Sequence, residues 1–246
     1  MINIEIKVPY TTRPVMHRRT GPAFRQIADS NKIAIKELEL QRHDKALWGA
    51  LPLANDFGLV SRMASHCGKL ATNSIVELAL GFQEDIAILH RGRLVATCFC
   101  FPSGWIPIQK LGMTLSDIHK PVADSQDLVR MSDRLAQTMA DPTLSGFERT
   151  VWTVTANPNL NNMPGAYPDY RAFRMEDLYF RYEYQSTDCL DDGVTSLFFV
   201  DTNVVPLLTV WQDLGSRIQD SINSMTDTML TYKNLHQIKK IINAGK

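Results

Sequence analysis

The sequence predicts an α+β protein with a mainly antiparallel β-sheet, a helical N-terminal region and a long C-terminal helix. Prolines divide the first third into short apolar segments, strand-like runs follow from about residue 75, and the last segment has a helical apolar period. The chain has 246 residues, of which 44% are apolar, which is enough for the core of one domain. We therefore expect a single domain, 1–246, made of a helical part (1–74), a sheet core (75–205) and the C-terminal helix (206–246).

The N-terminal region is expected to form short helices rather than one long helix. Pro14, Pro22 and Pro52 punctuate it. A proline inside a helix removes a backbone hydrogen bond and breaks the helix. The expected helices cover residues 23–27, 46–51 and 57–63.

A β-hairpin is predicted from two strand-like runs, at residues 85–90 and 94–101, that Arg91-Gly92-Arg93 separates. The second run, LVATCFCF, carries no charge on either face. This pattern is typical of a central strand that is covered on both sides. Cys98 and Cys100 fall on one face of it, and two thiols cannot complete a tetrahedral zinc site. We interpret them as apolar core residues.

A short helix is predicted beyond a loop rich in proline and glycine at residues 102–107. Thr114 is its expected N-cap, and Pro121 ends it just after His119. A polar helix at residues 125–139 and three strands, at 149–155, 178–186 and 195–201, complete the predicted core.

The C-terminal segment is predicted to be one amphipathic helix. A narrow apolar face of this kind packs against the sheet of its own domain or, alternatively, forms a dimer seam. The apolar residues that mark this face have a four-three-four spacing: Leu214, Ile218, Ile222, Met225 and Met229.

Composition and charge exclude several classes of function. Twenty-six basic residues balance twenty-six acidic ones, without the basic excess that binding to nucleic acid or to an anionic membrane requires. No apolar run is long enough to span a membrane, and the N-terminus lacks the pattern of a secretory signal. Signatures of hydrolases and nucleotide-binding proteins (GxSxG, HExxH, P-loop, GxGxxG) are absent. We expect a cytoplasmic protein with neither nucleic-acid nor membrane partners.

The six histidines are the candidate metal ligands. His119 stands out because Pro121 fixes the chain direction just beyond it, which would hold one imidazole inward. From these residues alone, a buried structural histidine is the favoured interpretation and a metal ligand is the alternative. His90 ends a hairpin strand beside two arginines and is expected to face solvent. The remaining four lie among polar neighbours and are expected at the surface: His17, His43, His66 and His236.

Polar and aromatic residues alternate along one predicted strand, FRYEYQ at residues 180–185. Arg181, Glu183 and Gln185 therefore point to one side, and the aromatic residues point to the other. The polar side either faces solvent or lines a ligand cavity. Periodicity leaves both interpretations open.

Three short motifs follow one another within about two dozen residues: CFPSGW at 100–105, KLG at 110–112 and IHKPV at 118–122. This combination resembles the haem-dependent oxidative N-demethylase family, alpha subunit, and the resemblance extends from about Leu78 to the end of the chain. Further elements agree with the family in order: Gln83-Glu84-Asp85, Arg149 near Trp152, Arg181-x-Glu183-x-Gln185 and Tyr232-Lys233.

The resemblance implies a PAS-like fold that binds haem b, with His119 as the iron ligand. It implies a haem-dependent monooxygenase that binds a small methylated amine and O2 and removes an N-methyl group as formaldehyde. Electrons would come indirectly from NADPH through separate flavin and iron–sulfur reductase subunits. At the site we expect Trp105 beside the haem, Arg149 or Arg181 on a propionate, and Glu183 on the cationic nitrogen of the substrate.

Two positions depart from the family's pattern and bear on the substrate and on the docking of an electron donor. Tyr184 stands where a second arginine is expected in the R-x-E-R-Q strand, and Val151 stands where an asparagine is expected before Trp152. Two alternative functions are a haem-binding PAS-like sensor or ligand-binding module without turnover, and a haem enzyme with other chemistry, such as N-oxygenation.

Overall fold

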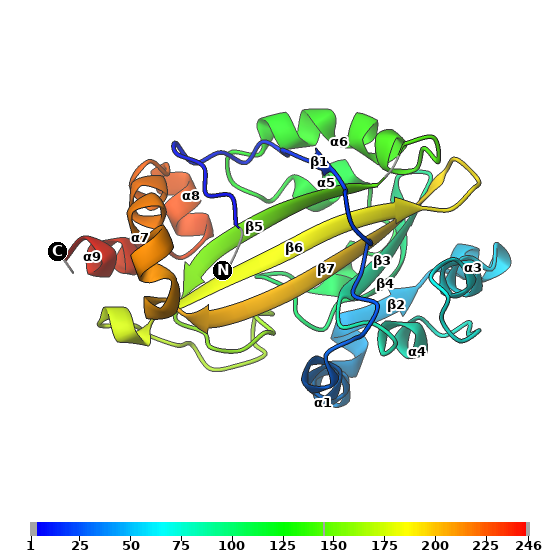
Figure 1. The fold of residues 1–246 in the computed structure, drawn as a ribbon, viewed down its shortest axis with the longest axis horizontal. Helices are drawn as coiled ribbons and strands as arrows, with labels where there is room; N and C mark the ends of the chain where they lie inside the picture. The colour runs from blue at the N-terminus through cyan, green and yellow to red at the C-terminus, as the bar shows by residue number, and fades with distance from the viewer. Residues whose placement is uncertain (1–3, 145, 245–246) are drawn as a thin grey trace.

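The fold is a seven-stranded antiparallel sheet flanked by helices (Figure 1). The structure, a computed structural model, describes residues 4–144 and 146–244. The strand order is β1-β5-β6-β7-β3-β4-β2. The prediction of an α+β fold with an antiparallel sheet is confirmed; the PAS-like description remains a prediction. The bounds are His17–Arg18 (β1), Trp48–Ala50 (β2), Asp85–His90 (β3), Arg93–Cys98 (β4), Phe147–Thr155 (β5), Tyr179–Cys189 (β6) and Thr195–Pro206 (β7).

The predicted hairpin is the β3–β4 pair. Arg91 and Gly92 have φ angles of 50° and 73°, and two successive positive φ values are those of the tight turn that matches strand twist. Cys98 and Cys100 are fully buried in the core, as predicted. His90, in contrast, is only 5% exposed, so the prediction that it faces solvent is wrong. The ring of Phe57, 5.3 Å away between centroids, covers it.

The N-terminal region is helical, but its helices differ from those predicted. No helix covers residues 23–27, residues 46–51 run from the end of α1 into β2, and residues 57–63 overlap α3. The longest helix, α1, was not predicted because much of its buried face is polar: Lys36 and Glu39 are buried beside Leu40 and Leu47. The helices are α1 (Ser30–Leu47), α2 (Pro52–Asp56), α3 (Leu59–His66) and α4 (Ile75–Ala79).

The two helices that the sequence predicted follow the hairpin, after a short 3₁₀ turn that it did not predict. After η1 (Pro107–Lys110), the one-turn helix α5 spans Leu115–His119, and α6 spans Gln126–Met139. The Thr114 hydroxyl accepts a hydrogen bond from the backbone N–H of Asp117, so the predicted N-cap is confirmed. A second 3₁₀ turn, η2 (Met175–Asp177), leads into β6.

The C-terminal segment consists of three helices, so the prediction of one long helix is wrong. They are α7 (Leu208–Asn223), α8 (Asp227–Tyr232) and α9 (His236–Ala244). Thr226 caps α8 by accepting a hydrogen bond from the N–H of Met229, and Asn234 has a φ of 54°, which ends the helical path before α9. Met229 is nevertheless buried, because the chain turns back onto the same core.

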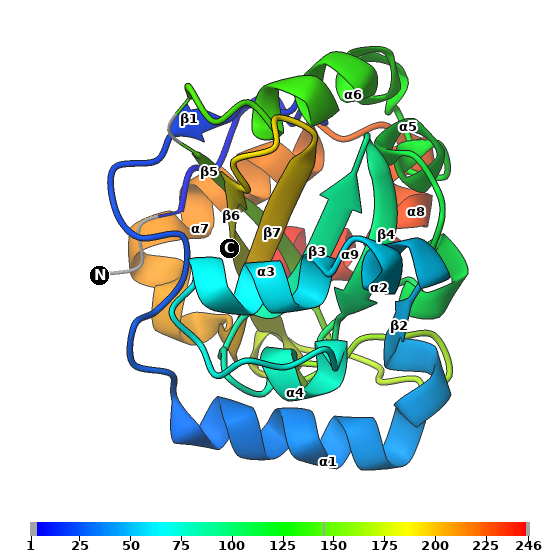
Figure 2. The same ribbon diagram turned by 90° about the vertical axis from the view of Figure 1, so that its right-hand side faces the viewer.

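The two faces of the sheet carry different helices. Phe180 and Tyr182 of β6 face the core under α7, whereas Val200 of β7 lies in a separate cluster with Ile118 of α5. Figure 2 shows α7 and α5 on opposite sides of the central strands. The α5 side holds most of the predicted site residues. Among the described residues, no helix is long and apolar enough to cross a membrane.

Candidate functional site

The imidazole of His119 is held in one tautomer at the end of α5. Its Nδ1 lies 2.8 Å from the carbonyl oxygen of Leu115, one helical turn earlier. A carbonyl can only accept a hydrogen bond, so Nδ1 carries the proton and Nε2 keeps its lone pair. Metal-binding histidines are typically oriented by such a bond from the nitrogen that does not bind the metal. The geometry is therefore suited to a metal ligand.

The electrostatic surroundings keep His119 neutral near pH 7. Its pKa is lowered to about 4, mainly by burial and also by the charges of Arg149 and Lys110, while the hydrogen bond to Leu115 opposes these effects. A neutral imidazole with a free Nε2 lone pair is the form that binds iron. Arg149 comes from β5, thirty residues further along the chain, so the fold brings two of the predicted site residues into electrostatic range.

Apolar side chains pack beside His119. Its neighbour Ile118 lies in one cluster with Phe99, Val200 and Trp105. The rings of Phe99 and Trp105 are 5.1 Å apart between centroids. The structure therefore places Trp105, another predicted site residue, in the same cluster as the residue that precedes His119.

A row of polar side chains crosses β5 and β6 on the same sheet face. Arg149 Nε donates to Gln185 Oε1 at 2.6 Å, and Gln185 Nε2 donates to Glu183 Oε2 at 2.8 Å. Glu183 Oε1 lies 3.8 Å from the Arg181 guanidinium. Arg181 is 1% exposed and Gln185 is 9% exposed. The interpretation of this row as a solvent-facing surface is therefore wrong.

The side chain of Arg181 is hydrogen-bonded to the protein backbone. Its two terminal nitrogens donate to the carbonyl oxygens of Leu160, at 2.5 Å, and Phe101, at 2.7 Å. These bonds fix two loops against β6. Only Nε, which is buried without a hydrogen-bond partner among the described residues, remains unused.

Arg149 has more binding capacity than Arg181. Among the described residues, its side chain donates one hydrogen bond, from Nε to Gln185, and no carboxylate lies within 4.0 Å of its guanidinium. Burial lowers its pKa, and the charge of Glu183 opposes this effect. Of the two arginines predicted to hold a propionate, Arg149 is the one whose terminal nitrogens are not taken by the backbone.

Two residues beside this site, Tyr10 and Lys233, were given no role from the sequence. Lys233 Nζ donates to the backbone carbonyl of Trp152 at 3.3 Å and lies 5.5 Å from the Tyr10 ring centroid. Burial raises the pKa of Tyr10 to about 12 and lowers that of Lys233 to about 8. The Tyr232-Lys233 pair agreed with the family's pattern in the sequence. The sequence did not show, however, that the N- and C-terminal segments meet at β5.

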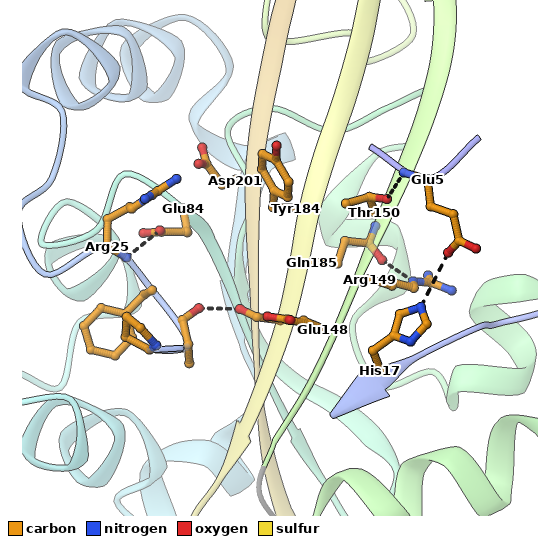
Figure 3. Close-up of a pocket in the computed structure, with 14 residues that line it drawn as sticks. Glu5, His17, Arg25, Glu84, Glu148, Arg149, Thr150, Tyr184, Gln185 and Asp201 are labelled. Atoms are coloured by element: carbon orange, nitrogen blue, oxygen red, sulfur yellow. Dashed lines mark hydrogen bonds and ion pairs between the residues drawn. The ribbon is translucent and has the colours of Figure 1, made fainter. Parts of the chain in front are cut away.

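A separate cavity of about 460 Å³ contains only one of the predicted site residues, Arg149. Figure 3 shows Glu84 and Asp201 on one side of strand β6 and Arg149 on the other. The cavity is rich in carboxylates, and His119, Trp105 and Glu183 are not among its lining residues. Its charged lining residues are Glu5, His17, Arg25, Glu84, Glu148, Arg149 and Asp201.

A haem fits the donor chemistry beside His119. In the described part of the chain, no group of three or more His, Cys, Asp and Glu side chains could hold a bare metal ion. Haem iron needs only one protein ligand, because the porphyrin nitrogens supply four others. The two cations that interact electrostatically with the imidazole, Arg149 and Lys110, suit a group that carries two carboxylates.

Comparison with known proteins agrees with this chemistry. A family model described as haem-dependent oxidative N-demethylase, alpha subunit-like, matches residues 56–243. A search of curated proteins finds no match.

The lowered pKa of His119 predicts a specific pH dependence of stability. Between about pH 6.5 and 4 the unfolded chain binds a proton at this histidine that the folded chain does not, so the free energy of unfolding falls as the pH is lowered through this window. We expect the His119→Gln variant to lose stability less steeply than the wild type in urea titrations across that range. The exposed His236→Gln variant is the control and should follow the wild type. Equal slopes for His119→Gln and the wild type would contradict the assignment.

Proposed function

Because the chain belongs to the haem-dependent oxidative N-demethylase, alpha subunit-like family, we propose that it is a haem-dependent oxidoreductase that removes an N-methyl group from a small amine as formaldehyde. The observation that carries this proposal is the neutral, oriented imidazole of His119. Its Nδ1 proton is fixed on Leu115 and its Nε2 lone pair is available to iron.

The residues around His119 would hold haem b. His119 would bind the iron, Arg149 would pair with a propionate, and Trp105 would flank the macrocycle through the cluster it shares with Ile118. When bound, the haem supplies binding and activation of O2, since a single axial histidine leaves one face of the iron open. Arg181 would act indirectly, because its bonds to Phe101 and Leu160 hold the loops in place.

Glu183 is the proposed anchor for the substrate amine. Its Oε2 accepts a hydrogen bond from Gln185, while Oε1 has no hydrogen bond from the described residues and lies 3.8 Å from Arg181. An alkylammonium nitrogen could donate to Oε1, and a hydrogen bond between two charged groups is roughly twice as strong as a neutral one. Holding the amine in one orientation would then supply much of the rate enhancement.

The two departures from the family's pattern fall on opposite faces of the sheet. Tyr184 packs edge-on against Tyr182, with ring centroids 5.6 Å apart, so it lies away from the polar row. Val151 is the Cα partner of Glu183 and shares its face. An apolar side chain beside the carboxylate favours an amine with alkyl substituents, so Val151 is the departure that bears on the substrate.

The proposal extends to the electron supply and the location. The chain would receive electrons indirectly from NADPH through separate flavin and iron–sulfur subunits and would work in the cytoplasm. A fold of PAS type, used for catalysis instead of sensing, belongs to the same proposal.

Replacing His119 tests haem binding directly. The His119→Ala variant should fold, as judged by circular dichroism, but should lose most of the Soret absorbance per chain after reconstitution with haem. The exposed His236→Ala variant should keep it. A wild-type Soret spectrum in His119→Ala would show that another residue binds the iron, and the buried His90 would be the next candidate. If the wild type binds haem but releases no formaldehyde when it is incubated with methylamines, O2 and a reductant, that result would favour the sensor function instead.

Replacing Glu183 tests the amine site. Glu183→Gln keeps the size and the hydrogen-bonding capacity but removes the charge, so an amine-induced Soret shift should need roughly ten- to a hundredfold more amine. Haem content should not change. Equal amine affinity in Glu183→Gln and the wild type would show that the substrate site lies elsewhere.

A further inference from the structure

Among the described residues, the outer edge of β5 pairs with another strand over only a short part of its length. In the described part of the chain, β1 pairs with β5 only through Phe147 and Glu148. Further along this strand, the carbonyl oxygen of Trp152 accepts a hydrogen bond from Lys233 Nζ at 3.3 Å. Lys233 directly follows α8, so the C-terminal helices bring its ammonium group to β5.

The ammonium of Lys233 has no carboxylate partner. Among the described residues no Asp or Glu oxygen lies within 4.0 Å of Nζ, and its contacts are the Trp152 carbonyl and the face of the Tyr10 ring. Burial lowers its pKa to about 8, and the charge of Glu183 only partly offsets this effect. A partly buried cation without a counter-charge is destabilising, so the site favours an anionic ligand.

Arg149 is in the same situation and in the same neighbourhood. Its guanidinium is desolvated, and it interacts electrostatically with Glu183 and Tyr10, the two groups that also surround Lys233. Arg149 lies on β5 three residues before Trp152, and its side chain is on the α5 side of the sheet. Arg149 and Lys233 therefore form a pair of cations along one stretch of β5.

Glu183 cannot balance the cations around it. Arg149, Arg181 and Lys233 all interact electrostatically with this one carboxylate, so Glu183 alone cannot balance them. Asp85 lies 3.8 Å from a cation of its own, the Lys36 ammonium.

We propose that Lys233 and Arg149 together form a site for the two propionates of haem, one propionate on each cation. Arg181 is excluded from this role because its terminal nitrogens donate to Leu160 and Phe101. The inference rests on the proposed haem function. It adds Lys233 to the haem site and assigns one propionate to Lys233 and the other to Arg149. A dicarboxylate would supply the two negative charges that Glu183 alone cannot provide.

The test compares haem with its dimethyl ester, which keeps the porphyrin and the iron but has no carboxylate charge. Soret titrations give the affinity of both probes for each variant. The Lys233→Met variant should bind haem roughly ten- to a hundredfold more weakly than the wild type, the loss expected for one charged hydrogen bond. Its affinity for the dimethyl ester should not change. Lys233→Arg should restore the preference for haem, and Lys240→Met, at an exposed position of α9, should leave both affinities unchanged.

Three outcomes would overturn the assignment. If Lys233→Met weakens both probes equally, Lys233 acts through packing, and if it weakens neither, the propionates lie elsewhere. If Lys233→Arg binds haem as weakly as Lys233→Met, charge is not the cause. A wild-type protein that binds neither probe would instead overturn the proposed haem function, so the two failures are distinguishable.

Discussion

The hydrogen bond from His119 Nδ1 to the carbonyl of Leu115 is the interaction on which this account depends. It fixes the tautomer within a single helical turn, and that turn is held by the Thr114 cap at one end. The surrounding fold completes the effect, because burial and Arg149 keep the imidazole neutral. A flexible or charged histidine at this position could not present a lone pair to iron. The position of α5 against the sheet therefore determines the chemistry of the site.

Segments that are distant in sequence enclose the edge of β5. The backbone N–H of Tyr10 donates to Ser224 Oγ at 2.8 Å, which joins the N-terminal segment to the end of α7. Asp124, between α5 and α6, accepts a hydrogen bond from Thr226 at the start of α8. Three parts of the chain thus converge on one strand edge. Their convergence desolvates Arg149 and Lys233, and it is this desolvation that makes an anionic ligand favourable.

The sequence predicted those parts of the fold whose signals are local. The turn at Arg91-Gly92 and the Thr114 cap depend on neighbouring residues, and both were predicted. The helix α1 was missed because it buries Lys36, whose hydrogen bonds go to the distant carbonyls of Ala79, Phe82 and Glu84. Likewise, alternation placed Glu183 and its neighbours on one face but could not show that this face is buried. The contact between Arg149 and Gln185 depends on the register of β5 against β6, which the sequence alone does not give.

The position of the iron is the most direct test of the account. Crystals of the haem-reconstituted protein, measured at the iron absorption edge, give an anomalous peak that locates the metal without reference to the porphyrin density. The account predicts one peak per chain at bonding distance from His119 Nε2, on the α5 side of the sheet. A peak beside His90, or in the carboxylate-rich cavity lined by Glu84 and Asp201, would contradict it.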